Sequence, residues 1–131
     1  MSAEDVEFLR RNLATLADEG YEALLPLVHP DFEMETLPGI AAEPQVYRGR
    51  DGMRRWWESF FEVMDEVRIE PTEFHDAGEG KVVMEALLRA RGQSSGLEVT
   101  QGTYLVCHLR DELLLRIEFF LTLEEALAAT S

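Results

Sequence analysis

Three ionisable residues in the second half of the chain have the side chains that proton-transfer chemistry needs. Glu85, His108 and Glu118 each lie in a stretch where polar and apolar residues alternate. A carboxylate or an imidazole acts as a general acid or base when it lies within hydrogen-bonding distance of the reacting atom. Arg89 and Arg116 lie in the same stretches and are suited to hold a developing oxyanion. Glu85, His108 and Glu118 are therefore the candidate catalytic residues.

The alternation in these stretches predicts strands, and it divides the predicted sheet into two faces. The candidate catalytic residues share a face of mixed polarity, whereas the other face is almost wholly apolar. If the apolar face packs on the helices, the mixed face meets solvent or a partner subunit. Glu85, His108 and Glu118 then form cross-strand ion pairs of modest value. Both the catalytic and the ion-pair interpretation are compatible with the sequence.

Hydrophobic periodicity predicts the elements that position these residues. Helices are expected over residues 3–18 and 21–28, and a third helix opens at 49–52 and carries a stripe rich in tryptophan and phenylalanine. A short strand is expected at 32–37, followed by a loop at 38–45 that is long enough to form a pocket rim or lid. Four strands at 67–75, 81–91, 97–110 and 113–121 follow, joined by hairpin turns. Thr122 and Glu125 form a capping box that starts a short last helix.

Helices followed by a meander of strands are typical of a single α+β domain, here over residues 1–131, with an antiparallel sheet covered by helices on one face. If that apolar face lines a cavity, its polar groups are few, which suits a small hydrophobic ligand. The same aromatic residues are equally well explained as plain core. The predicted pocket residues are Phe32, Met34, Tyr47, Trp56, Trp57, Phe60, Gln101, Thr103 and Cys107.

Composition excludes several other partners. The chain has 26 acidic and 12 basic residues and a net charge of −14, which disfavours nucleic acid and anionic membranes because both need a basic surface. Cys107 is the one cysteine and the three histidines lack zinc-type spacing, so we expect no metal site and no disulfide. The acidic segment Met1–Asp5 has no apolar core of the kind signal peptides carry, so we expect a cytoplasmic protein.

Short motifs in a fixed order give the chain a resemblance to a known family. They are the segments 29–32 (HPDF), 47–52 (YRGRDG), 76–78 (DAG), 95–96 (SG) and 125–127 (EAL). With this order the chain resembles the nuclear transport factor 2-like superfamily, and within it the SnoaL-like branch. The resemblance implies a cone-shaped barrel, in which a curved, mostly antiparallel sheet wraps around three helices of the N-terminal half, with a short C-terminal helix. It also implies a homodimer formed through the sheet.

The resemblance leaves two functions open, because one fold hosts many activities. One is an isomerase, cyclase, dehydratase or hydrolase that acts without a cofactor on a small hydrophobic polyketide, terpenoid or steroid-like compound. The other is a non-catalytic module for ligand binding or dimeric interaction. The chain departs from the family pattern at Glu112, where a glycine is usual, and at Thr122, where an acidic residue is usual. The second departure weakens the transfer of an acid–base role to this end of the fold.

Overall fold

The computed structural model describes residues 2–35, 46–62 and 64–130, with only the backbone at residues 2, 3, 35, 60 and 61. The predicted loop at 38–45 lies outside the described residues. In the part of the chain that is described, no helix has both the length and the apolar character needed to cross a membrane. The elements, in chain order, are α1 (Ser2–Glu19), the 3₁₀ helix η1 (Tyr21–Leu27), β1 (Val28–Glu35), β2 (Val46–Arg48), α2 (Gly49–Phe61), β3 (Met64–Gly78), β4 (Lys81–Gly92), β5 (Glu98–Arg110), β6 (Leu113–Phe120) and α3 (Leu123–Ala128).

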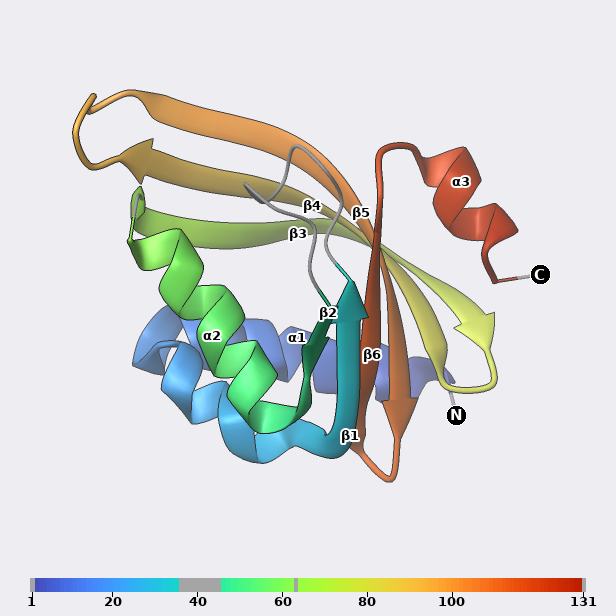
Figure 1. Cartoon of the computed structure of the whole chain (residues 1–131). Helices are drawn as coiled ribbons and strands as arrows, with labels where there is room; N and C mark the ends of the chain where they lie inside the picture. Colours follow the sequence, from blue (N-terminus) through green and yellow to red (C-terminus); the bar gives the residue numbers. More distant parts are fainter. Residues whose placement is uncertain (1, 36–45, 63, 131) are drawn as a thin grey trace.

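The strands form one six-stranded sheet with the order β2-β1-β6-β5-β4-β3. Neighbouring strands are antiparallel except for β1 and β6, which run parallel. The sheet is strongly curved but not closed, and α1, η1 and α2 lie on its concave side (Figure 1). The short helix α3 lies against the opposite face, where Ala126 packs on Val83 and Val106. This arrangement confirms the predicted α+β fold, with its N-terminal helices and its short C-terminal helix.

Three elements in the first half of the chain differ from the sequence prediction. The second helix is a 3₁₀ helix that includes Pro26, which cannot donate the backbone hydrogen bond of a regular helix interior. The strand that follows begins at Val28 rather than at Phe32, and its pairing with β6 shifts register between Val28 and Glu33. The three-residue strand β2 was not predicted, because so short a segment has no readable alternation.

Alternation along β4 and β5 places their apolar residues on the concave face, as predicted. Val82 pairs with Cys107, Met84 with Leu105 and Ala86 with Thr103. Alternation also predicts that Leu113 and Leu115 of β6 lie on the apolar face, and this prediction is wrong. A register shift between His108 and Leu109 of β5 inserts one extra residue into β6. Leu114 therefore lies on the concave face in place of its two neighbours, and it is buried there.

The helix α2 is held close to the sheet by its first turn. The Nε atom of Arg50 donates a hydrogen bond of 2.9 Å to the backbone oxygen of Val28 at the start of β1. Gly52 lies directly on Tyr47, and a Cβ atom at position 52 would come within 2.8 Å of the Tyr47 carbonyl carbon. Only glycine allows that approach, which turns Met53, Trp56 and Trp57 toward the sheet, where all three are buried.

Candidate functional site

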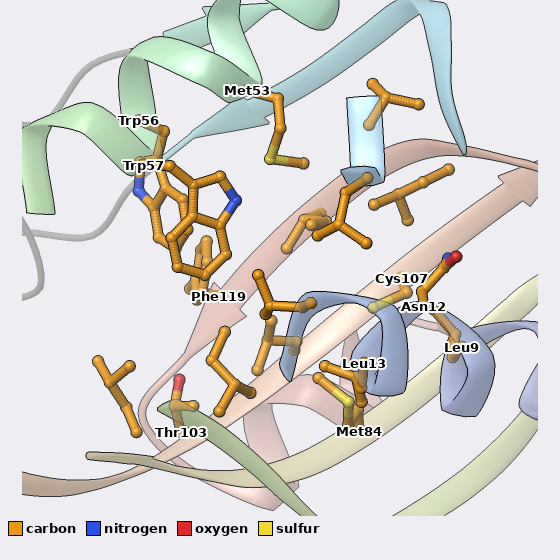
Figure 2. A pocket seen from close by; sticks show the side chains of 18 of the residues that line it. Leu9, Asn12, Leu13, Met53, Trp56, Trp57, Met84, Thr103, Cys107 and Phe119 are labelled. Carbon is orange, nitrogen blue, oxygen red and sulfur yellow. The ribbon is translucent and has the colours of Figure 1, made fainter. Parts of the chain in front are cut away.

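An apolar cavity of about 100 Å³ lies between the concave face of the sheet and the helices that cover it (Figure 2). Its walls come from α1, η1, α2 and from strands β1 and β3 to β6. Apolar residues supply nearly the whole lining, so the cavity offers a ligand hydrophobic contact with very few polar groups. The lining residues are Leu9, Asn12, Leu13, Leu16, Leu24, Leu27, Val28, Met53, Trp56, Trp57, Ile69, Met84, Leu88, Gln101, Thr103, Leu105, Cys107, Leu114, Ile117 and Phe119.

Aromatic rings form one wall of the cavity. The rings of Trp56 and Trp57 meet edge to face at a centroid distance of 4.7 Å. Trp56 also stacks on Phe119 of β6 at 5.9 Å, and Trp57 stacks on Tyr21 of η1 at 6.1 Å. Ring pairs in these arrangements attract one another beyond the effect of buried area alone, so these contacts stabilise the wall. A flat apolar ligand would find a preformed aromatic surface here.

Four polar side chains reach the cavity: Asn12 of α1 and Gln101, Thr103 and Cys107 of β5. The hydroxyl group of Thr103 is fully buried and has no hydrogen-bond partner among the described residues. Burial raises the pKa of the Cys107 thiol to about 12, because a thiolate would lose its hydration in these apolar surroundings. Cys107 is therefore an uncharged thiol at neutral pH and is not activated as a nucleophile.

No carboxylate, imidazole, ammonium or guanidinium group is among the described residues that line the cavity. The thiol of Cys107 is the one titratable group there, and its proton is held too tightly to be exchanged near neutral pH. General acid–base catalysis needs a group whose pKa lies near the working pH. The described part of the cavity therefore holds no side chain suited to proton transfer near neutral pH.

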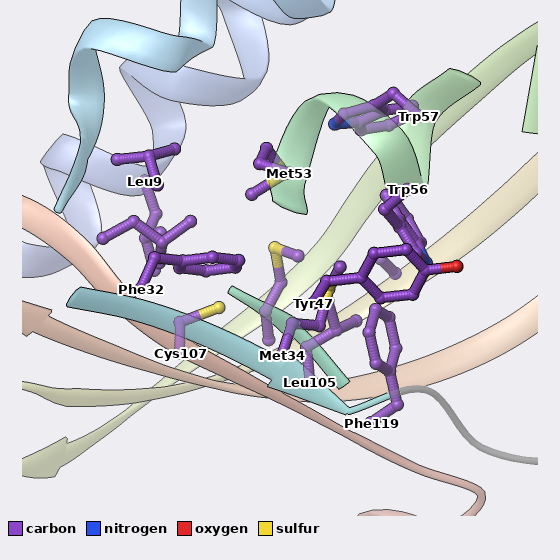
Figure 3. Close-up of a cluster of buried hydrophobic side chains, with 14 of the residues drawn as sticks. Leu9, Phe32, Met34, Tyr47, Met53, Trp56, Trp57, Leu105, Cys107 and Phe119 are labelled. Carbon is purple, nitrogen blue, oxygen red and sulfur yellow. The ribbon is translucent and has the colours of Figure 1, made fainter. Parts of the chain in front are cut away.

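The predicted pocket residues separate into three groups. Trp56, Trp57, Gln101, Thr103 and Cys107 line the cavity. Phe32, Met34 and Tyr47 belong to the packed core beside it and do not reach its surface (Figure 3). The side chain of Phe60 lies outside the described residues.

The candidate catalytic residues lie on the opposite face of the sheet from the cavity. His108 and Glu118 are bonded through Nε2 and Oε1 at 2.7 Å, and Arg116 approaches the same carboxylate at 3.6 Å. Glu85 bonds His75 of β3 at 2.6 Å. The two histidine contacts join neighbouring strands. None of the three candidate catalytic residues lines the cavity. The geometry is that of cross-strand ion pairs, which the sequence had left open as the alternative to catalysis.

One group of side chains on this outer face has donors suited to a metal ion. Ligand atoms of Glu73, His75 and Glu85 lie within 4.8 Å of one another. The carboxylate of Glu73 is largely exposed and lies 3.9 Å from the His75 ring nitrogen. The hydrogen bond between His75 and Glu85 accounts for the arrangement without an ion, and we assign no metal to it.

The family model of the SnoaL-like domain matches residues 9–117, which is most of the chain. The chain belongs to the SnoaL-like domain family. A search of curated proteins by sequence finds no match. The family assignment confirms the resemblance seen in the short sequence motifs.

Solved structures of similar fold cover nearly the whole SnoaL-like chain. An NTF2-like protein of unknown function from Burkholderia pseudomallei has a TM-score of 0.78 at 16% identity, over 97% of this chain and 97% of that one. TerC, crystallised with polyporic acid, has a TM-score of 0.77 at 20% identity, over 95% and 98% of the two chains. A putative SnoaL-like polyketide cyclase from Jannaschia sp. CCS1 has a TM-score of 0.75 at 16% identity, over 99% and 93%. At such identities the likeness establishes the fold alone.

Sequence reasoning missed the wall that α1 contributes to this SnoaL-like cavity. Leu9, Leu13 and Leu16 line the cavity, but in the sequence they contribute only to the periodicity that predicts the helix at 3–18. That periodicity is the same whether the apolar face meets a packed core or a cavity. Asn12 carried a usable signal. It lies on the same helical face as Leu9 and Leu16, and it is buried with 9% of its surface exposed. A polar residue within an apolar stripe indicates a gap, a polar partner or a ligand on the other side.

Proposed function

We propose that this SnoaL-like domain is a ligand-binding protein for a small, uncharged, apolar compound of about one ring. The observation that supports this most directly is the lining of the cavity, in which the described residues bring aromatic and aliphatic groups but no charged group. A charged ligand would lose its hydration there without a counter-charge, which is costly. The binding module is thus favoured over the acid–base enzyme.

The size of the cavity limits the ligand. Its volume of about 100 Å³ is somewhat below the roughly 150 Å³ of an engineered apolar cavity that stays dry and takes up benzene. A single aromatic ring is therefore the largest rigid group that enters without rearrangement. A polycyclic polyketide or a steroid needs several times this space. That TerC was crystallised with polyporic acid shows that a protein of similar fold accommodates an organic compound, and this supports the proposal by analogy only.

Intrinsic fluorescence gives a direct test. Both tryptophans of the chain, Trp56 and Trp57, line the cavity, so a ligand that enters it changes the whole tryptophan signal. We expect toluene to change the emission saturably and to raise the melting temperature, because a ligand present at 100 times its Kd stabilises the native state by about 2.7 kcal/mol. A polycyclic hydrocarbon should do neither.

A pair of variants separates binding in the cavity from binding elsewhere. Leu105→Phe places a larger side chain on the cavity face of the sheet and should weaken the response to toluene. Leu87→Phe makes the same change on the outer face of the neighbouring strand and should leave the response unaltered. If toluene gives no saturable signal with the unmodified protein, or if both variants respond alike, the proposed function is wrong.

A further inference from the structure

The hydroxyl of Thr103 is a buried polar group in the cavity wall, and it has no hydrogen-bond partner among the described residues. The residue is only 7% exposed, and the side chain extends from β5 into the cavity (Figure 2). A buried hydroxyl without a partner destabilises the native state, since it has given up its bonds to water. A ligand that enters the cavity and bonds to this hydroxyl would offset that cost.

The surroundings of Thr103 leave room for a ligand. Its partner across the ladder on β4 is Ala86, whose side chain is a single methyl group. On the other side, the described pairs between β5 and β6 stop at Tyr104 and Phe120, one residue short of Thr103. Along the sheet, Thr103 is therefore flanked by a small residue on one side and by the end of the paired region on the other.

The aromatic wall lies next to this hydroxyl. Phe119 pairs with Leu105, two residues along β5 on the same face, so it is the diagonal neighbour of Thr103 across the ladder. Diagonal neighbours in a sheet lie roughly 7–8 Å apart, within the length of an aromatic ligand. Trp56 stacks on Phe119 and extends the wall. A ring held against this wall therefore lies within reach of the Thr103 hydroxyl.

Two other buried polar side chains of the cavity, Cys107 and Asn12, lie away from Thr103. Cys107 lies four residues along β5, which corresponds to about 13 Å at the rise of a strand. In Figure 2, Cys107 and Asn12 lie at the other end of the cavity from Thr103. At the aromatic end the polar groups are the Thr103 hydroxyl and the indole nitrogens of Trp56 and Trp57, and of these only the hydroxyl can both donate and accept a hydrogen bond. Half-buried Gln101 lies two residues beyond Thr103 on β5.

We infer that the ligand is a single-ring aromatic compound carrying one uncharged hydroxyl or carbonyl group, and that Thr103 selects it by a hydrogen bond to that group. This inference rests on the proposed function and adds to it the polar group of the ligand. A threonine hydroxyl both donates and accepts, so it pairs with a phenol or with a ring ketone. A ligand that supplies this bond also relieves the unpaired hydroxyl of the empty cavity.

Phenol and toluene test the inference, because they have nearly the same shape and differ in the group that meets Thr103. The affinity ratio of phenol to toluene is measured by tryptophan fluorescence in the unmodified protein, in Thr103→Val and in Thr103→Ser. Comparing ratios removes the difference in hydrophobicity between the two probes. We expect Thr103→Val to reduce the ratio about tenfold, the effect of one hydrogen bond, and Thr103→Ser to retain it. Thr100→Val, an exposed change on the same strand, is the matched control and should leave the ratio unchanged.

The outcomes separate this inference from the proposal on which it rests. If neither probe binds the unmodified protein, the proposed function fails and the inference fails with it. If toluene binds but the ratio is the same in Thr103→Val as in the unmodified protein, the cavity binds ligands and the role of Thr103 is refuted. If Thr103→Val does not fold, Thr103→Ala takes its place with the same expected fall in the ratio.

Discussion

Replacing Thr103 by valine should stabilise the empty protein, although it removes a polar group from the proposed binding site. Valine has nearly the shape of threonine, and both residues favour strands. The hydroxyl that is lost has no hydrogen-bond partner among the described residues, and the methyl group that replaces it is buried in an apolar cavity wall. The change therefore removes an unfavourable burial and adds a favourable one.

The size of the effect follows from these two contributions. A buried hydroxyl without a partner costs about 1–3 kcal/mol by mutational data. The added methyl contributes less than the roughly 0.8 kcal/mol of a fully buried group, since the cavity does not pack on it closely. We expect the free energy of unfolding to rise by about 1–2 kcal/mol. For a domain of 131 residues, about 1 kcal/mol shifts the melting temperature by about 4 °C, so the expected rise is about 4–8 °C.

Chemical denaturation and calorimetry, both without ligand, measure this difference. Thr100→Val serves as the control, because position 100 is an exposed site on the same strand and should change stability by less than about 0.5 kcal/mol. A loss of stability of 1 kcal/mol or more in Thr103→Val, relative to this control, would refute the reasoning. Such a loss would mean that the Thr103 hydroxyl already makes a hydrogen bond in the protein without ligand.

Three further predictions concern Cys107 and the turn between β5 and β6. Cys107 should react with a disulfide reagent at pH 8 only as fast as the protein unfolds. Its pKa of about 12 leaves almost no thiolate in the native state. Rapid labelling of the folded protein would contradict the burial of this thiol. Because that pKa is raised from 9.0, Cys107 contributes stability that is complete below about pH 9 and declines as the pH rises toward 12, and Cys107→Ala should lessen this decline in denaturation curves. Glu112 has a φ of 59° in the turn between β5 and β6, a left-handed conformation that glycine adopts with less strain. Glu112→Gly should therefore raise the free energy of unfolding by about 0.5–1 kcal/mol. An unchanged or lower midpoint of unfolding in urea would count against strain at this turn.

The element order was predictable because hydrophobic periodicity changes where helices give way to strands. Local chemistry was also readable: Thr122 caps α3 by accepting a hydrogen bond from the Glu125 backbone nitrogen, as the capping box predicts. The inward turn of Leu114 was not predictable, because it depends on an extra residue in one strand of a pair. Nothing in the local sequence marks such an insertion, and alternation alone placed its neighbours on the wrong face.

The candidate site was predictable only in part, for a related reason. Alternation along β5 identified Gln101, Thr103 and Cys107 together, since a strand places every second residue on one face. It gave no means to decide between cavity and core for Phe32 and Met34, which depends on how tightly the helices pack on the sheet. That packing is a property of the assembled layers and not of any single element.

The parallel pairing of β1 with β6 determines when the cavity can exist. Glu33 of β1 pairs with Arg116 of β6, 83 residues later in the chain. By contrast, β3, β4 and β5 each pair with the next strand in the sequence. Contacts between residues this far apart in the sequence form slowly, because the long segment between them must lose conformational entropy before the contacts can form. During synthesis the apolar faces of the N-terminal helices are not fully covered until β6 has emerged, since Phe119 of β6 stacks on Trp56. Until then the aromatic wall of α2 is open to other chains, so we expect the time before β1 docks to be the period in which this protein most needs a chaperone.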